Sequence, residues 1–117
     1  MSATTVAGIR AQRRNARIAG LREAIQPLLG DPDREEVWLF GSWARGDWDA
    51  YSDVDLLAIA PDQEGAEALA DALRARGLAD DVIALTQEEW VRRRQGEDPW
   101  WRGIGRDAIR LAGDAAP

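Results

Sequence analysis

The chain has 117 residues, 45% of them hydrophobic, and a formal net charge of -6. We expect this length to form a single domain with a modest core. The chain contains no cysteine and no histidine, which excludes disulfides, thiolate-bound zinc and imidazole chemistry and leaves oxygen ligands for any metal or catalytic site. The acidic balance argues against direct binding of nucleic acid.

Hydropathy gives no indication of a membrane protein. No window approaches the roughly 20 apolar residues that span a bilayer, and the N-terminus lacks a charged segment followed by an apolar signal core. We therefore expect a cytoplasmic protein with no membrane association.

The first predicted element is a helix from about residue 5 to residue 29. Four apolar residues recur at helical spacing in its second half: Ile18, Leu21, Ile25 and Leu28. This half should pack on a sheet. Residues 10–17 contain four arginines and no apolar stripe, so residues 1–17 should form a charged, frayed helical extension. A solvated helix end is favoured over an arginine surface for an acidic partner.

A first strand is predicted at residues 36–40, and it leads into Gly41 and Ser42. This pair would let backbone N–H groups turn toward a phosphate at the start of a short helix. Gly41 lacks the Cβ that would block that approach. Arg45, in the short helix, would face either a triphosphate or a neighbouring acid.

The surface loop that follows holds two aromatic residues, Trp48 and Tyr51. Either could stack on a base or cap the core.

Two aspartates stand at the beginning of the next apolar run. Ten residues separate Ser42 from Asp53, and Asp55 follows at i+2. In a strand this spacing puts both carboxylates on one face. Mg2+ prefers oxygen ligands and usually takes one or two carboxylates, with water and phosphate oxygens in its other positions. A dication would also relieve the repulsion between the two charges, so the pattern favours a magnesium-nucleotide site over a solvated strand edge.

A crossover helix is predicted from about residue 63 to residue 76, with Asp62 as N-cap and Gly77 after its end. Such a connection favours a parallel strand pair, which would bring Asp81 level with the two earlier aspartates. Asp80 is a competing choice. Asp81 is preferred because it alternates with the apolar residues Ile83 and Leu85.

Two further helices are predicted near the C-terminus. Residues 86–89 form a capping box that opens a helix through about Arg94, with Trp90 and Val91 facing inward. Asp98 and Pro99 then open a last helix. We expect it to continue up to Gly113, with a buried stripe formed by Trp101, Ile104, Ala108 and Leu111. Trp100 lies off this stripe, and it faces a partner or forms a partly buried rim.

The spacing Gly41-Ser42, ten residues, Asp53-x-Asp55 resembles the signature of the nucleotidyltransferase superfamily that includes DNA polymerase beta and kanamycin nucleotidyltransferase. The longer pattern is similar to that of the minimal nucleotidyltransferase domains, many of which are antitoxins paired with HEPN-domain toxins. It reads Gly41-Ser42-x-Ala44-Arg45-Gly46, then Ser52-Asp53-x-Asp55-Leu56. Asp81 matches the family's third acid, and the resemblance covers roughly residues 20–113.

The resemblance implies a fold and a division of the chain. The fold would be the α/β (α+β) nucleotidyltransferase fold, a small mixed sheet of three to four strands packed by helices in a single domain. Residues 1–17 would be the helical extension, residues 18–113 the minimal nucleotidyltransferase domain and residues 114–117 a disordered tail.

The resemblance also implies a reaction, the transfer of a nucleoside monophosphate from a nucleoside triphosphate to a hydroxyl. Asp53, Asp55 and Asp81 would be the catalytic residues and would bind two Mg2+ ions, and Asp81 would help to deprotonate the acceptor. Nucleotide-binding residues would be Gly41, Ser42, Arg45 and Ser52. With ATP as donor and a tyrosine of a cognate HEPN ribonuclease toxin as acceptor, the product would be an AMPylated, silenced toxin.

Two alternatives stay open. In the first, the same fold neutralises its toxin by binding alone, although three intact acids argue for catalysis. In the second, a small molecule such as an aminoglycoside is the acceptor, which the lack of a second domain disfavours.

Overall fold

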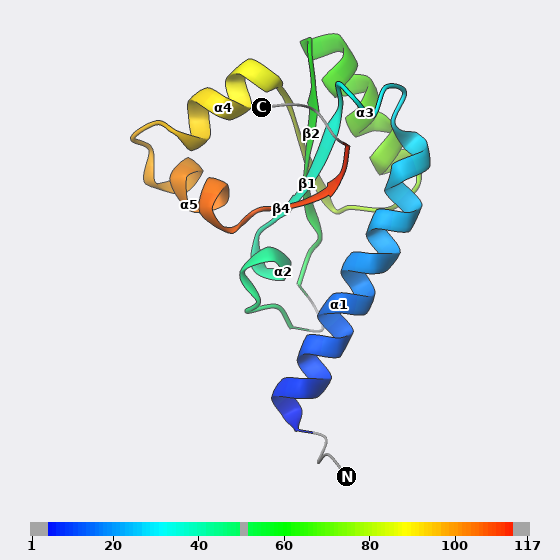
Figure 1. The fold of residues 1–117 in the computed structure, drawn as a ribbon, viewed down its shortest axis with the longest axis vertical. Helices are drawn as coiled ribbons and strands as arrows, with labels where there is room; N and C mark the ends of the chain where they lie inside the picture. Colours follow the sequence, from blue (N-terminus) through cyan, green and yellow to red (C-terminus); the bar gives the residue numbers. More distant parts are fainter. Residues whose placement is uncertain (1–4, 50–51, 114–117) are drawn as a thin grey trace.

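A mixed sheet of four strands forms the centre of the computed structural model, which describes residues 5–49 and 52–113 (Figure 1). The strands are β1 (Glu36–Phe40), β2 (Asp55–Ala60), β3 (Asp81–Thr86) and β4 (Ile109–Ala112). Their order across the sheet is β3-β2-β1-β4. β1 is antiparallel to both β2 and β4, whereas β2 and β3 are parallel. This is the small mixed sheet that the sequence predicts.

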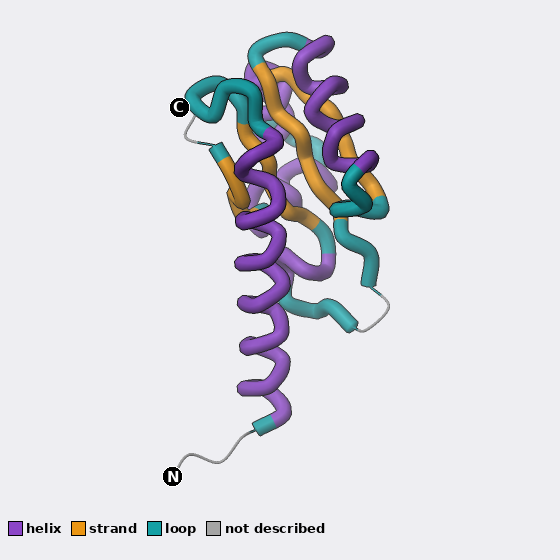
Figure 2. The backbone as a smooth tube through the Cα atoms, turned by 90° about the vertical axis from the view of Figure 1, so that its right-hand side faces the viewer, coloured by secondary structure: helices purple, strands orange, loops and turns teal. Residues whose placement is uncertain are grey.

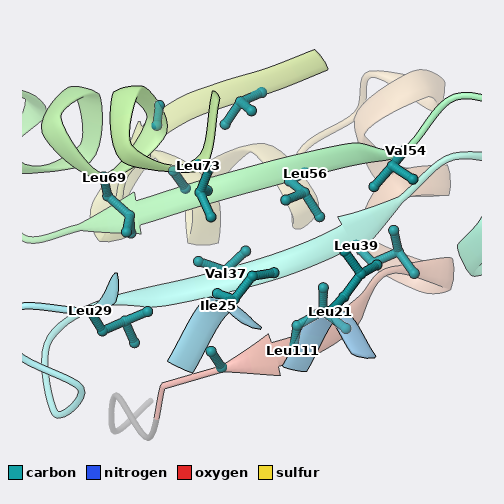
Figure 3. Close-up of a cluster of buried hydrophobic side chains, with 14 of the residues drawn as sticks. Leu21, Ile25, Leu29, Val37, Leu39, Val54, Leu56, Leu69, Leu73 and Leu111 are labelled. Atoms are coloured by element: carbon teal, nitrogen blue, oxygen red, sulfur yellow. The ribbon is translucent and has the colours of Figure 1, made fainter. Parts of the chain in front are cut away.

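Helices pack on both faces of the sheet (Figure 1). They are α1 (Val6–Ile25), the 3-10 turn η1 (Gln26–Leu28), α2 (Ser42–Arg45), α3 (Gln63–Ala75), α4 (Gln87–Arg94) and α5 (Pro99–Asp107). α1 and α3 cover one face, and their apolar side chains meet those of the strands in the cluster that Figure 3 shows. α4 and α5 cover the other face around the buried Trp90 and Trp101.

Strand periodicity explains these two cores. Val37 and Leu39 of β1 belong to the cluster under α1 and α3, whereas Phe40 of the same strand belongs to the cluster under α4 and α5. Successive side chains of a strand point to opposite faces. A sheet with apolar residues at nearly every position must therefore be covered on both sides.

The predicted crossover between β2 and β3 is confirmed. The Asp62 carboxylate accepts a hydrogen bond of 2.7 Å from the backbone N–H of Gly65 and caps α3. Gly77 follows the helix end with φ 65°. The parallel register then pairs Asp55 with Asp81, as the sequence predicts.

The last predicted helix is wrong in its second half. α5 ends at Asp107, and residues 109–112 form a strand that pairs with β1. This strand covers an edge of β1 that would otherwise expose unpaired backbone groups. Leu111 is buried on the α1 side of the sheet, so its burial belongs to strand alternation and not to a helical stripe.

Two smaller expectations also differ from the structure. Trp90 is buried, but Val91, expected to face inward, is 39% exposed. The extension expected over residues 1–17 is helical from Val6 onward, but as regular helix and not frayed, and the Thr5 hydroxyl caps it by accepting a hydrogen bond from the backbone N–H of Gly8. Residues 1–4 lie outside the described residues. Figure 2 shows α1 extending well past the end of the sheet. The tail at 114–117 lies outside the described residues.

In the described ranges, no helix combines the length and the apolar character needed to cross a membrane.

We expect Leu111→Ala to lower the free energy of unfolding by about 2–5 kcal/mol, because it leaves a cavity between β4 and α1. Urea denaturation followed by circular dichroism measures this. The control is Arg102→Ala on α5, an exposed position that should change stability by less than about 0.5 kcal/mol. Equal stability of the two variants would contradict the packing of β4.

Candidate active site

One pocket of about 670 Å3 gathers most of the predicted site residues. It lies where β1 ends and where the parallel strands β2 and β3 begin. Six of the seven predicted residues line it: Gly41, Ser42, Arg45, Asp53, Asp55 and Asp81. They come from three segments that are separate in the sequence, and the sheet brings them together.

The three aspartates reach the pocket through the backbone pairing of two segments. Asp55 opens β2 directly beside Asp81, which opens β3. Just before these strands, the backbone N–H groups of Asp80 and Asp81 donate to the Val54 carbonyl at 2.9 and 3.3 Å. The Asp80 carboxylate accepts the Val54 N–H at 2.8 Å. Asp80 thus links the segment before β3 to the segment before β2 by hydrogen bonds. Asp81, and not Asp80, lines the pocket.

Asp55 is less exposed than the other two acids of the group. Its burial raises the pKa of its carboxyl, and the charges of Asp81, Asp53 and Asp80 raise that pKa further. Arg45 acts in the opposite direction. The site therefore holds several negative charges near one partly buried carboxylate, an arrangement that a cation would stabilise.

Gly41 makes room for this carboxylate. It precedes α2 with φ 79° and ψ -156°, a conformation that is essentially restricted to glycine. A Cβ built on Gly41 would collide with Oδ2 of Asp55. The glycine that was expected to admit a phosphate thus also lets the backbone lie against the central acid.

Arg45 pairs with a neighbouring acid, one of the two roles left open for it. Its Nε lies 3.3 Å from Oδ2 of Asp47 in an exposed ion pair. It also lines the pocket, and its charge offsets part of the rise in the pKa of Asp55. A guanidinium in this position is available to a phosphate that enters the pocket.

Ser52 is the one predicted site residue that does not line the pocket. Its hydroxyl accepts a hydrogen bond of 2.8 Å from the backbone N–H of Asp49 and closes the loop. Trp48 is buried and stacks on Trp43 at 4.4 Å with the rings 6° apart, so it caps the core. Tyr51 lies outside the described residues.

Arginines of α1 hold the segment that carries the glycine turn. Arg14 donates from Nε and Nη2 to the carbonyl oxygens of Trp43 and Ala44, at 2.8 and 2.7 Å. Arg10 donates to the carbonyl oxygen of Trp48 and lies over its ring. A charged guanidinium satisfies carbonyls that a one-turn helix leaves unpaired. The arginines that suggested a frayed end thus hold α2 and Trp48 in place by hydrogen bonds to their carbonyl oxygens.

Residues of α5 form a wall of the pocket that the sequence analysis did not assign to the site. Trp100, Ile104, Arg106 and Asp107 line it. Arg106 and Asp107 form a double contact of 3.2 and 3.3 Å, and the hydrogen bond from Arg106 lowers the pKa of Asp107. The only sequence signal was the position of Trp100 off the buried stripe.

The donor set fits Mg2+ in its chemistry. The pocket offers the carboxylates of Asp53, Asp55 and Asp81, and Mg2+ is usually held by one or two carboxylates together with substrate phosphates rather than by a complete protein cage. Residues 5–49 and 52–113 contain no group of three or more acidic side chains placed to hold a metal ion by themselves. The absence of a Cβ at Gly41 leaves space next to the Asp55 carboxylate.

Together, the mixed α/β fold and the acidic pocket beside a glycine turn define a domain suited to phosphate-ester chemistry. The profile of the nucleotidyltransferase domain family matches residues 18–98, and the chain belongs to this family. The class of reaction is therefore nucleotidyl transfer, with a nucleoside triphosphate as substrate. The family match begins where the buried part of α1 begins and includes all three aspartates.

A solved structure of a candidate nucleotidyltransferase from Sulfolobus solfataricus is similar to the chain. The similarity covers 94% of this chain and 89% of that one, with 21% sequence identity and a TM-score of 0.49. No curated protein sequence matches the chain.

We expect Gly41→Ala to abolish nucleotide binding and to destabilise the fold by roughly 1–3 kcal/mol, because its Cβ would displace Asp55 and strain the backbone. Gly46→Ala is the matched control, since Gly46 also has a positive φ, of 92°, but has open space where the new methyl group would lie. Isothermal titration with ATP and Mg2+, together with thermal melting, compares the two. Equal nucleotide affinity in both variants would contradict the role given to Gly41.

Proposed function

We propose that the protein is a Mg2+-dependent adenylyltransferase of the cytoplasm that moves AMP from ATP onto a tyrosine hydroxyl of a cognate HEPN ribonuclease toxin. By this modification it would act as an antitoxin. One observation carries the proposal: the glycine turn and all three predicted aspartates line one pocket although they come from separate segments.

The site residues form two groups with different roles in this proposal. Asp53, Asp55 and Asp81 would hold two Mg2+ ions, which when bound stabilise negative charge on the phosphates and on the attacking oxygen. Gly41 and Ser42 would bind the terminal phosphates of ATP.

In the reaction, the acceptor oxygen forms a bond to the α-phosphorus while the bond to the bridging oxygen breaks, and pyrophosphate leaves. Asp81 takes the proton of the acceptor hydroxyl.

The exposure of the acids supports a macromolecular acceptor. Asp53 and Asp81 are exposed, whereas Asp55 is only partly accessible. A hydroxyl carried on the surface of another protein can therefore approach the outer acids without entering a deep cavity. The resemblance to antitoxins paired with HEPN-domain toxins supports the choice of a tyrosine of such a toxin.

We expect α-labelled ATP and Mg2+ to add the mass of AMP to a cognate HEPN protein, and we expect Asp53→Asn to reduce this transfer by at least about 100-fold. Intact mass spectrometry of both chains measures it. Asp71→Asn is the matched control, because this aspartate of α3 is exposed and paired with Arg74 away from the pocket.

The same experiment separates catalysis from neutralisation by binding. An Asp53→Asn protein that still binds the toxin but no longer modifies or silences it supports the enzyme. If this variant silences the toxin as well as the wild type does, and no nucleoside triphosphate gives a mass gain, the protein is a binding antitoxin and the proposal fails.

A further inference from the structure

The pocket is lined by apolar residues as well as by acids. Trp100, Ile83, Ile104 and Phe40 line it together with the aspartates. Phosphates and metal ions do not need such a wall. A ligand that fills the whole pocket must combine a strongly charged part with an apolar part.

Trp100 is the accessible surface of this wall. It is 55% exposed, whereas its neighbour Trp101 is 9% exposed. Because the indole of Trp100 is exposed, the protein lacks the stabilising free energy that burial of this side chain would give. A flat ligand that covered the indole would recover it.

The ring of Trp100 is also held in place. It makes edge contacts with Phe40, at 6.4 Å and 83°, and with Trp101, at 4.9 Å and 84°. Its backbone N–H donates to the Asp98 carboxylate at 2.9 Å. Pro99 fixes the first turn of the helix. An indole fixed in this way loses little conformational entropy when a ligand stacks on it.

Building on the proposed function, we propose that Trp100 is the stacking platform for the base of the donor nucleotide. The nucleotide then lies across the pocket, with its phosphates at Gly41 and the aspartates and its base on α5. A nucleobase has the flat face that the indole can cover, and a stack of this kind is typically worth enough to change affinity by about fivefold or more. In this proposal the wall favours a nucleotide over a simple polyphosphate.

The test compares a ligand that has a base with one that lacks it. Trp100→Ala, Trp100→Phe and wild-type protein are titrated with α,β-methylene-ATP and with inorganic tripolyphosphate, each with Mg2+. We expect Trp100→Ala to bind the nucleotide about fivefold or more weakly and tripolyphosphate unchanged, and Trp100→Phe to recover most of the loss. Val91→Ala, which removes an exposed apolar side chain outside the pocket, should match the wild type for both ligands.

Three outcomes overturn the base platform. Unchanged nucleotide affinity in Trp100→Ala shows that the base lies elsewhere. An equal loss for nucleotide and tripolyphosphate shows that Trp100 only shapes the pocket. Unchanged nucleotide affinity with reduced transfer to a protein acceptor shows that Trp100 contacts the acceptor.

These measurements need no transfer to occur. A loss of nucleotide affinity that depends on Trp100 supports the platform even if no acceptor is modified. Transfer that persists in Trp100→Ala with the same nucleotide affinity rejects the platform and leaves the proposed function intact.

Discussion

The parallel register between β2 and β3 is the constraint on which the site depends. It places Asp55 beside Asp81, although like charges repel and the pKa of Asp55 is raised by its burial and by its neighbours. The apolar residues Leu56, Leu57 and Val82 follow immediately on both strands and are buried. They belong to the cores on the two faces of the sheet, and their burial stabilises the paired strands against the repulsion of the two acids.

The glycine turn is adjusted to that register. Gly41 follows β1, whose pairing with β2 sets Phe40 opposite Asp55. The turn must therefore pass directly over the Asp55 carboxylate, where a Cβ has no space. On the far side of the turn, Arg14 holds two carbonyls of the segment. The glycine turn is thus held by the sheet at one end and by α1 at the other.

Local signals were enough to predict the part of this arrangement that a single strand-helix-strand unit forms. The cap at Asp62, the helix that follows it and the alternation of β2 and β3 led directly to the pairing of Asp55 with Asp81. The nucleotidyltransferase fold itself was inferred from the resemblance of Gly41-Ser42 and Asp53-x-Asp55 to a known signature. The contacts of Arg14 join residues about 30 positions apart, and no periodicity in the sequence reports such a contact.

The C-terminal segment shows why periodicity alone failed there. Ile104, Ala108 and Leu111 satisfy the helical spacing, while Ile109 and Leu111 satisfy the strand spacing equally well. The open edge of β1 decides between them, because pairing with β4 satisfies backbone groups that a longer helix would leave exposed. A short stretch of sequence does not show whether a distant strand edge needs a pairing partner.

The same pairing has a consequence for the pocket. Because β4 pairs with β1, α5 is anchored to the sheet at its C-terminal end, and α4 also packs against α5. Trp100 is therefore held against Phe40, the last residue of the strand that ends at the glycine turn. Phe40 lies opposite Asp55 in the sheet, and Asp55 lies beside Asp81, so the sheet itself sets the distance between the acids and the aromatic residue that contacts Trp100.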